Sequence, residues 1–517
     1  MRDEPTNKNG KSQAKKQKSF KPKARVPRGL RDVTGGELAL QSRMIATISE
    51  IYEHYGFGAL DTPALEYADA LGKFLPDDDR PNEGVFALQD DDDQWMSLRY
   101  DLTAPLARYV AQHYDQLPKP LRRYQWGNVW RNEKSGQGRF REFLQIDADT
   151  VGGGNIMADA EMCMMAADCM GALGFETGQY CVRINNRKIM DGLLAAIGLD
   201  TQAADFDTRR LIILRAMDKY ARLGIDGVRA LLGEGRKDES GDFTKGAALT
   251  AQQIEPIANM VAIGTSKNGT REAVLAQMEN LIGQTDAGAA GLAELREMGA
   301  IFAELGYAPA QLAIDAAIVR GLGYYTGPVY EIDLAIEAES EAGEMARFGA
   351  VGGGGRYDDL IKRFKGVEIP ATGVSIGISR LAAALATTLA AGGGKAEPES
   401  QNAPLVVVSV MDKARRPQSM RDVQALRAAG IRAELYVGDG AMKAQLRYAD
   451  VRGARLVVIE GEDEIANGMV TLKDLALGKA QADDIADNAE WRASKHAQQQ
   501  VAKADLVNKI KEILEKS

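Results

Sequence analysis

Histidine and cysteine are both scarce in this chain of 517 residues, which contains three of each. The histidines (His54, His113 and His496) are too few for most histidine-based catalytic triads and for a multi-histidine metal site. The three cysteines include no CxxC pair and cannot build a disulfide framework in so long a chain. We therefore expect a protein of the reducing cytoplasm that has no metal site of its own.

Three further absences limit the possible functions. No run of about 18 uncharged apolar residues occurs, so we expect no membrane-spanning segment. The N-terminus lacks the apolar core of a secretory signal. The chain also has no Walker A sequence and no GxGxxG that opens a helix after a strand. A bound nucleotide would therefore have to lie on a sheet and be held by arginines.

The first 28 residues carry ten Lys or Arg and two acidic residues, with almost no apolar ones. Such a stretch cannot bury enough surface to offset the entropy lost on ordering, so residues 1–28 are predicted to be a flexible basic tail. The tail is either a solubilising segment or an electrostatic arm for RNA phosphates. The net charge of the whole chain, -9, does not point towards nucleic acid, but local patches matter more than the sum.

The pattern of apolar residues predicts helices and strands in alternation up to about residue 390, interrupted by a helical insertion at about 190–310. Two predicted strands, 123–131 and 141–150, form a β-hairpin with a polar, charged tip at 132–138. The other predicted elements of this region are helices at 37–54 and 157–173 and strands within 313–334 and 348–378.

A glycine-rich segment at 391–403 is predicted to be a linker. Beyond it, apolar strands alternate with helices, which is typical of a small, mostly parallel sheet covered by helices. The predicted strands are 405–410, 431–437 and 455–460, and the predicted helices are 418–429 and 441–452. The Lys-, Gln- and Ala-rich residues 483–517 are predicted to form a terminal helix.

The strand at 141–150 alternates polar and apolar side chains, and residues two apart in a strand face the same way. Leu144, Ile146 and Ala148 should face the core. The opposite face carries Arg141, Phe143, Gln145, Asp147 and Asp149. An arginine suits a phosphate because its planar fork makes paired, charge-assisted bonds, and a phenylalanine offers a flat surface to an adenine ring. This face is either a ligand site or an ordinary solvated face of the sheet.

Two glycine-containing clusters follow. Residues 319–327 (VRGLGYYTG) combine a tight backbone path with paired tyrosines, and they form either a ligand-binding wall or a turn before a strand. Residues 352–358 and 373–380 place glycines on strands, where a ligand or another backbone can approach closely. Arg380 would then lie at a strand-to-helix junction, where it could clamp a triphosphate. A run of four glycines alone is also common in loops.

Taken in this order, the clusters resemble the three motifs of class II aminoacyl-tRNA synthetases and the specific boxes of histidyl-tRNA synthetases. The resemblance covers about residues 29–479. Its parts are motif 1 with its dimer contact at 56–66 (including Pro63), the amino-acid-binding stretch at 98–105, motif 2 at 131–143, the histidine-specific box at 319–327 and the end of motif 3 at 377–381.

The resemblance implies an α+β fold, with an antiparallel-sheet class II catalytic domain that carries the helical insertion, followed by an α/β anticodon-binding domain. The implied boundaries are 29–390 for the catalytic domain, 391–403 for the linker, 404–480 for the anticodon-binding domain and 481–517 for a C-terminal helical extension. From the residues alone, a generic α/β module of unknown ligand is the alternative for the C-terminal unit.

The resemblance also implies roles for individual residues. The histidine substrate would be bound by Asp101, Thr103, Gln145 and Asp149 around its α-amino group and by Tyr324, Tyr325 and Tyr357 around its imidazole ring. ATP would be bound by Arg131 at the α-phosphate, by Glu133 and Arg139 nearby, by Phe143 stacked on adenine and by Arg380 at the terminal phosphate. Contacts to tRNA are expected from Gln137 in the motif 2 loop and from Lys443 and Arg447 on one helix face, although the last two could be merely solvated charges.

Arg131 and Arg320 are the expected catalytic residues. The histidine carboxylate attacks the α-phosphate of ATP, and two approaching anions need preorganised positive charge rather than a side-chain nucleophile. Arg320 would supply that charge where related enzymes often use a metal ion. ATP, with Mg2+, is a substrate, and no organic cofactor is expected. The other expected partners are L-histidine, histidine tRNA, charged at its 3′ end, and a second copy of the chain bound through motif 1.

Three residues or segments depart from the family pattern. Gly323 stands where an acidic residue is usual, Ser379 replaces a glutamate, and the loop 134–138 lacks a proline-containing tip, which leaves recognition of the extra 5′ guanosine of histidine tRNA open. A rival reading is a histidine-binding regulatory subunit of ATP phosphoribosyltransferase, which usually lacks the anticodon domain and often the motif arginines. A non-catalytic RNA-binding module would explain the basic tail but not the arginine-bearing motifs.

Overall fold

The computed structural model describes most of the chain, and the chain divides into two compact units with a boundary between Ala391 and Gly392. The described residues are 22–71, 84–133, 140–199, 203, 205–237, 241, 243–263, 270–319, 325–339, 345–391, 404–477 and 497–515. Within these ranges no helix is both long and apolar enough to span a bilayer.

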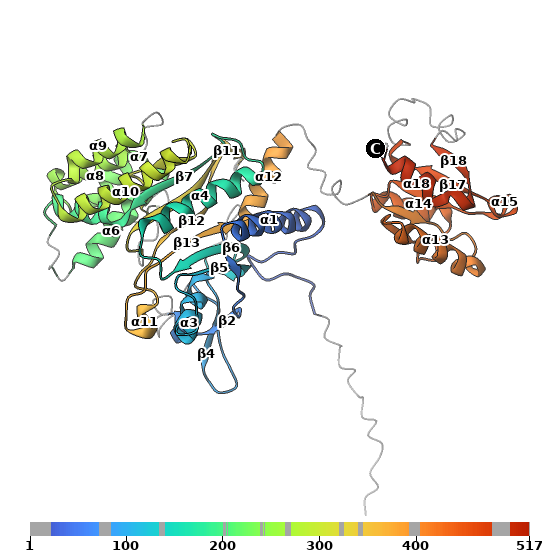
Figure 1. Cartoon of the computed structure of the whole chain (residues 1–517), viewed down its shortest axis with the longest axis horizontal. Helices are drawn as coiled ribbons and strands as arrows, with labels where there is room; N and C mark the ends of the chain where they lie inside the picture. Colours follow the sequence, from blue (N-terminus) through green and yellow to red (C-terminus); the bar gives the residue numbers. More distant parts are fainter. Residues whose placement is uncertain are drawn as a thin grey trace, which may run out of the picture. The chain divides into compact units, whose positions relative to one another are not determined.

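An eight-stranded sheet forms the centre of the first unit (Figure 1). Its strands are, in spatial order, β1 (Gly58–Ala59), β5 (Leu121–Trp130), β6 (Glu142–Val151), β13 (Ala371–Gly377), β12 (Met345–Arg356), β11 (Pro328–Glu339), β7 (Tyr180–Asn186) and β10 (Leu312–Ile314). The six inner strands pair antiparallel, and β1 and β10 add parallel edges. The expected antiparallel sheet of an α+β domain is confirmed.

Three helices cover one face of this sheet: α1 (Gly35–His54), α4 (Ile156–Ala172) and α12 (Ile378–Ala391) (Figure 1). The apolar side of β6, with Ile146 and Ala148, is fully buried in the same core as Ile48 of α1 and Met162 of α4. The alternation along β6 therefore has its expected orientation, and its polar row faces away from this core.

The segment expected to be a helical insertion contains five helices among its described residues. They are α6 (Phe206–Asp218), α7 (Tyr220–Leu232), α8 (Ala251–Ile263), α9 (Arg271–Ile282) and α10 (Asp286–Glu304), preceded by α5 (Arg187–Ala196). A short hairpin of β8 (Gly235–Lys237) and β9 (Phe243–Lys245), which the apolar pattern did not indicate, lies between α7 and α8.

A second, three-stranded sheet contains β2 (Leu65–Tyr67), β4 (Trp95–Leu98) and β3 (Ala87–Gln89), and it lies beside α2 (Ala68–Leu71) and α3 (Thr103–His113). Pro63 of motif 1 lies between β1 and β2. The flanking carbonyl groups of Thr62 and Ala64 accept hydrogen bonds from Arg99 (2.8 and 2.9 Å) instead of joining a ladder, and proline itself has no N–H to donate.

The second unit contains a five-stranded mixed sheet of β15 (Ala433–Leu435), β14 (Val406–Val408), β16 (Leu456–Ile459), β17 (Met469–Asp474) and β18 (Gln498–Ala502). The first three strands are parallel and the last two antiparallel, so the sheet is less parallel than expected. Its helices include α13 (Arg416–Ala428), α14 (Met442–Val451), the short α15 (Glu462–Ala466) and α18 (Leu506–Glu515).

Of the terminal helix predicted over 483–517, Leu506–Glu515 is helical (α18), but residues 498–502 form a strand. Residues 498–502 pair with β17, and α18 buries Leu506 and Ile510 in the core of this unit. The unit therefore extends past 480 to α18. The composition did not reveal this strand, because Gln498–Gln500 are exposed and only Val501 is buried. The open edge of β17, rather than local preference, decides the conformation of the segment.

Candidate active site

The predicted hairpin of β5 and β6 is present, with cross-strand pairs from Leu121–Val151 to Trp130–Glu142. Residues 134–139, and with them Gln137 and Arg139, lie outside the described residues. The polar row of β6 is buried: the exposed fractions of Gln145, Asp147 and Asp149 are 4%, 1% and 2%. A solvated sheet face is therefore excluded for these three residues.

Small and polar residues on three neighbouring strands form one patch around this row. Across β5 and β6 the pairs are Arg123–Asp149, Gln125–Asp147 and Gly127–Gln145, and across β6 and β13 the partners are Gly373, Ser375 and Gly377. Directly paired residues point to the same side of a sheet, so these side chains share a face. A side chain at Gly373 would collide with the carboxylate of Asp149.

Asp149 is held from two sides. Its Oδ2 forms an ion pair with the Nη2 of Arg123 (2.8 Å), and its Oδ1 accepts a hydrogen bond from the hydroxyl of Tyr357. Arg123 also donates to the carbonyl of Leu102 (2.8 Å), next to the start of α3. Arg123 was not predicted, although its place on β5, two residues from Gln125, was the available signal.

Among the described residues, none forms an ion pair with Asp147. Gln145 donates from Nε2 to both of its carboxylate oxygens (2.8 and 3.0 Å). Burial, and then the charge of Asp149, raise the pKa of Asp147 to about 7. Burial also raises the pKa of Asp149, an effect that Arg123 opposes. The described part of the patch thus holds more carboxylate than cationic charge, which suits a positively charged ligand group such as an ammonium.

The amino-acid-binding stretch lies at the start of α3. Oδ1 of Asp101 accepts from the backbone N–H groups of Thr103 (3.0 Å) and Ala104 (2.9 Å), so Asp101 caps the helix, which the motif alone did not indicate. Thr103 is buried. One carboxylate can accept about four hydrogen bonds, so the cap leaves Asp101 able to bind a ligand as well.

A second cluster lies at the other end of β6. The guanidinium of Arg131 lies 4.4 Å from the ring centre of Tyr100 and 5.1 Å from that of Phe143. The hydroxyl of Tyr100 donates to Oε1 of Glu133 (2.9 Å). The structure therefore brings together three of the residues expected to bind ATP, and it adds Tyr100, which was not predicted.

Arg380 lies in the first turn of α12, directly after β13, as expected of a strand-to-helix junction. Its Nη2 donates to the carbonyl of Phe348 (2.9 Å). Ser379, which departs from the family pattern, accepts a hydrogen bond from the N–H of Leu144 (3.0 Å) and so ties the start of α12 to β6.

Residues 320–324 of the histidine-specific box, and with them Arg320, Gly323 and Tyr324, lie outside the described residues. A Cβ at Gly355 would lie 2.9 Å from the ring of Tyr325, so the glycine allows this ring to rest on β12. Next to it, the buried Arg356 donates to Asp159 of α4 (Nε to Oδ2, 3.1 Å), an ion pair that was not predicted.

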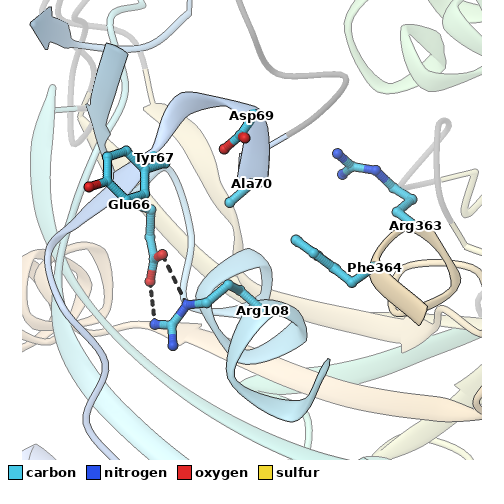
Figure 2. Close-up of a pocket in the computed structure, with 7 residues that line it drawn as sticks. All are labelled: Glu66, Tyr67, Asp69, Ala70, Arg108, Arg363 and Phe364. Carbon is cyan, nitrogen blue, oxygen red and sulfur yellow. Dashed lines mark hydrogen bonds and ion pairs between the residues drawn. The ribbon is translucent and has the colours of Figure 1, made fainter. Parts of the chain in front are cut away.

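A cavity of about 330 Å³ lies apart from these clusters (Figure 2). It is lined by Glu66, Tyr67, Asp69, Ala70, Arg108, Arg363 and Phe364. Arg108 donates to both carboxylate oxygens of Glu66 (2.6 and 3.1 Å), as Figure 2 shows. None of the predicted site residues lines this cavity, so it is not the site argued above.

In the second unit, Lys443 and Arg447 lie four residues apart on α14, and both are exposed. Lys443 lies in the first turn of this helix, within the predicted helix at 441–452. Residues 463–468 include most of α15, whose start is stabilised by a hydrogen bond from the N–H of Gly461 to Glu464 (3.0 Å).

The family model described as "Histidyl-tRNA synthetase" matches residues 29–381. The chain belongs to the histidyl-tRNA synthetase family. A model described as "Anticodon binding domain" matches residues 405–513 and so includes β18 and most of α18. Within the described residues, no group of three or more His, Cys, Asp or Glu side chains is placed to hold a metal ion.

Curated members of the histidyl-tRNA synthetase family are similar over almost their whole length. The histidine–tRNA ligase of Caulobacter vibrioides is 51% identical over 495 residues, which cover 96% of this chain and 97% of that one. The histidine–tRNA ligase of Rhizobium leguminosarum bv. trifolii is 52% identical over 506 residues, 97% of each chain.

Two solved structures have a fold similar to that of this chain. The histidyl-tRNA synthetase of Nostoc sp. PCC 7120 has a TM-score of 0.69 at 28% identity and covers 95% of this chain and 100% of its own. A Bacillus halodurans protein described as "ATP phosphoribosyltransferase regulatory subunit/histidyl-tRNA synthetase" has a TM-score of 0.63 at 22% identity, covering 85% of this chain and 98% of its own. The second likeness shows the fold alone.

Proposed function

We propose that this chain is a histidine–tRNA ligase, which makes histidyl-adenylate from L-histidine and ATP and transfers histidine to the 3′ end of histidine tRNA. The observation that carries the proposal is the order of side chains along β6. Buried carboxylates lie at the Asp149 end, and Phe143 with its neighbour Arg131 lies six residues away, about 20 Å at about 3.3 Å per residue. This order matches that of histidyl-adenylate, from ammonium to adenine.

At the amino-acid end, we assign the substrate ammonium to Asp101, Thr103, Gln145 and Asp149. The excess of buried carboxylate in the patch favours a cation there. Tyr324, Tyr325 and Tyr357 are assigned to the imidazole. Since the hydroxyl of Tyr357 is bonded to Asp149, its contribution includes orienting that carboxylate.

At the nucleotide end, Arg131 and Arg320 neutralise charge as the histidine carboxylate attacks the α-phosphate, so that no side-chain nucleophile is needed. Phe143 takes the adenine ring, Arg380 the terminal phosphate, and Arg139 and Glu133 lie nearby. We propose that ATP binds as its Mg2+ complex. Glu133 could help to hold the ion, because its bond to Tyr100 leaves acceptor sites unused.

For tRNA, we propose phosphate contacts from Lys443 and Arg447 of α14 and an acceptor-end contact from Gln137. We further propose a cytoplasmic homodimer. Large apolar side chains on the three-stranded sheet are 39–57% exposed and would be covered by a second copy; they are Leu65, Tyr67, Leu88 and Trp95.

The decisive experiment is ATP–pyrophosphate exchange with each of the twenty amino acids, followed by charging of histidine tRNA. Exchange with histidine alone, followed by charging, is expected. Histidine binding without any exchange would instead favour the regulatory subunit of ATP phosphoribosyltransferase.

A further inference from the structure

Arg123 is a buried cation in the middle of the catalytic sheet. Only 1% of its surface is exposed. Its Nη2 lies 2.8 Å from Oδ2 of Asp149 on β6 and 2.8 Å from the carbonyl oxygen of Leu102, between Asp101 and Thr103 at the start of α3. One side chain therefore links the two segments to which the substrate ammonium is assigned.

Several charged or titratable groups face Asp149 from the elements around it. They are Arg123 on β5, Tyr357 after β12, Asp101 before α3, Asp147 on β6 itself and Tyr52 on α1; β13 presents only Gly373. Among these described groups Arg123 alone is a cation. A buried carboxylate that loses its paired cation becomes strongly unfavourable unless it takes up a proton.

We propose that Arg123 is a positioning residue for the amino-acid pocket, which holds the carboxylate of Asp149 and the start of α3 in place around the substrate ammonium. This proposal rests on the proposed function. Arg123 does not itself bind the ammonium, because like charges repel and its guanidinium is already bonded to Asp149 and to the carbonyl of Leu102. Without it, the pKa of Asp149 would rise further, and a protonated carboxyl attracts an ammonium much less.

The consequences are specific. If the pKa of Asp149 rose to one unit above the assay pH, about one tenth of the molecules would carry the charge, and the KM for histidine would rise about tenfold. Raising the pH would restore the charge and lower the KM again. The nucleotide end of β6 would be little affected, so the KM for ATP should stay near its normal value.

The test compares wild type with Arg123→Met and Arg123→Lys by pyrophosphate exchange from about pH 6.5 to about pH 9. Arg122→Met is the matched control, since Arg122 points to the opposite face and pairs with Glu161 of α4. For each variant the ratio of its KM to that of wild type is used, because this ratio cancels the titration of free histidine. Circular dichroism and melting temperature confirm folding.

We expect the KM ratio for histidine to be about ten or more at pH 7 in Arg123→Met, to fall towards one at pH 9, and to be smaller in Arg123→Lys. Arg122→Met should keep a ratio near one throughout. A folded Arg123→Met with an unchanged KM for histidine overturns the proposal. Equal, pH-independent increases in both KM values also overturn it, because they indicate general damage.

If Arg123→Met does not fold, Arg123→Gln, which is also neutral, is judged by the same two criteria. Failure of the proposed function is seen separately, as absence of exchange in wild type. In that case histidine titrations by calorimetry compare the same variants, with the dissociation constant in place of KM.

Discussion

Replacing Asp147 by asparagine should stabilise the first unit at neutral and alkaline pH. The pKa of Asp147 is raised from 3.8 to about 7 by burial and by Asp149, whereas an unfolded chain restores the ordinary value. A raised pKa stabilises the folded state fully below about pH 4, and this contribution is lost as the pH rises to about 7. Asparagine cannot ionise, so the variant does not undergo this loss.

The size of the effect follows from the shift. Between about pH 4 and about pH 7 the folded state holds about one more proton than the unfolded state, so the advantage of the variant grows by about 1.4 kcal/mol per pH unit, to at most about 4 kcal/mol. In wild type, Nε2 of Gln145 donates to both oxygens of Asp147. Part of the gain is lost in the variant because the NH2 group of asparagine replaces one of these acceptors with a donor.

Urea unfolding of wild type and Asp147→Asn at about pH 5 and about pH 8 measures this difference. Tryptophan fluorescence follows mainly the first unit, which contains Trp95, Trp126 and Trp130 of the four tryptophans. Asp115→Asn, at an exposed position after α3, serves as the control. The reasoning is refuted if the difference between wild type and Asp147→Asn is the same at both pH values.

Three other predictions concern activity. Arg320→Ala should lower adenylate formation about a hundredfold or more, about 2.7 kcal/mol, with histidine and ATP binding still measurable; near-normal pyrophosphate exchange would remove this residue from the mechanism. Removal of residues 1–28 should weaken tRNA binding and flatten its salt dependence without changing exchange, because phosphate contacts release counterions; equal salt slopes would show the tail to be a solubilising segment. Lys443→Glu with Arg447→Glu should raise the KM for tRNA in charging but leave exchange intact, whereas Lys511→Glu on α18 should change neither; equal charging by all three proteins would contradict the contact.

The catalytic sheet could be predicted because its signals are local. The alternation of Leu144, Ile146 and Ala148 with polar residues spans one strand. It predicts both the strand and the side that packs in the apolar core. Arg380 was placed correctly for the same reason, since the glycine-containing strand and the apolar helix around it are adjacent in sequence.

The rest depends on contacts between distant segments. The role of Arg123 can be recognised only in the folded structure. There Asp149 lies across the hairpin from Arg123, and the carbonyl group of Leu102 accepts its hydrogen bond. β18 forms because β17 offers an open edge, which no property of the glutamine-rich segment reveals. The capping role of Asp101 likewise depended on where α3 begins, and the motif alone did not fix that point.

The four glycines of β12 have a consequence for strand alignment. Side chains on facing strands normally fix which residues pair, and a glycine run offers none, so β12 could slide by one residue against β13 at little cost. Two contacts directly after the run oppose such a slip: Arg356 with Asp159 and Tyr357 with Asp149. A shift of one position would turn both side chains to the wrong faces. The polar contacts that shape the amino-acid pocket therefore also fix the register in which β12 pairs with β13.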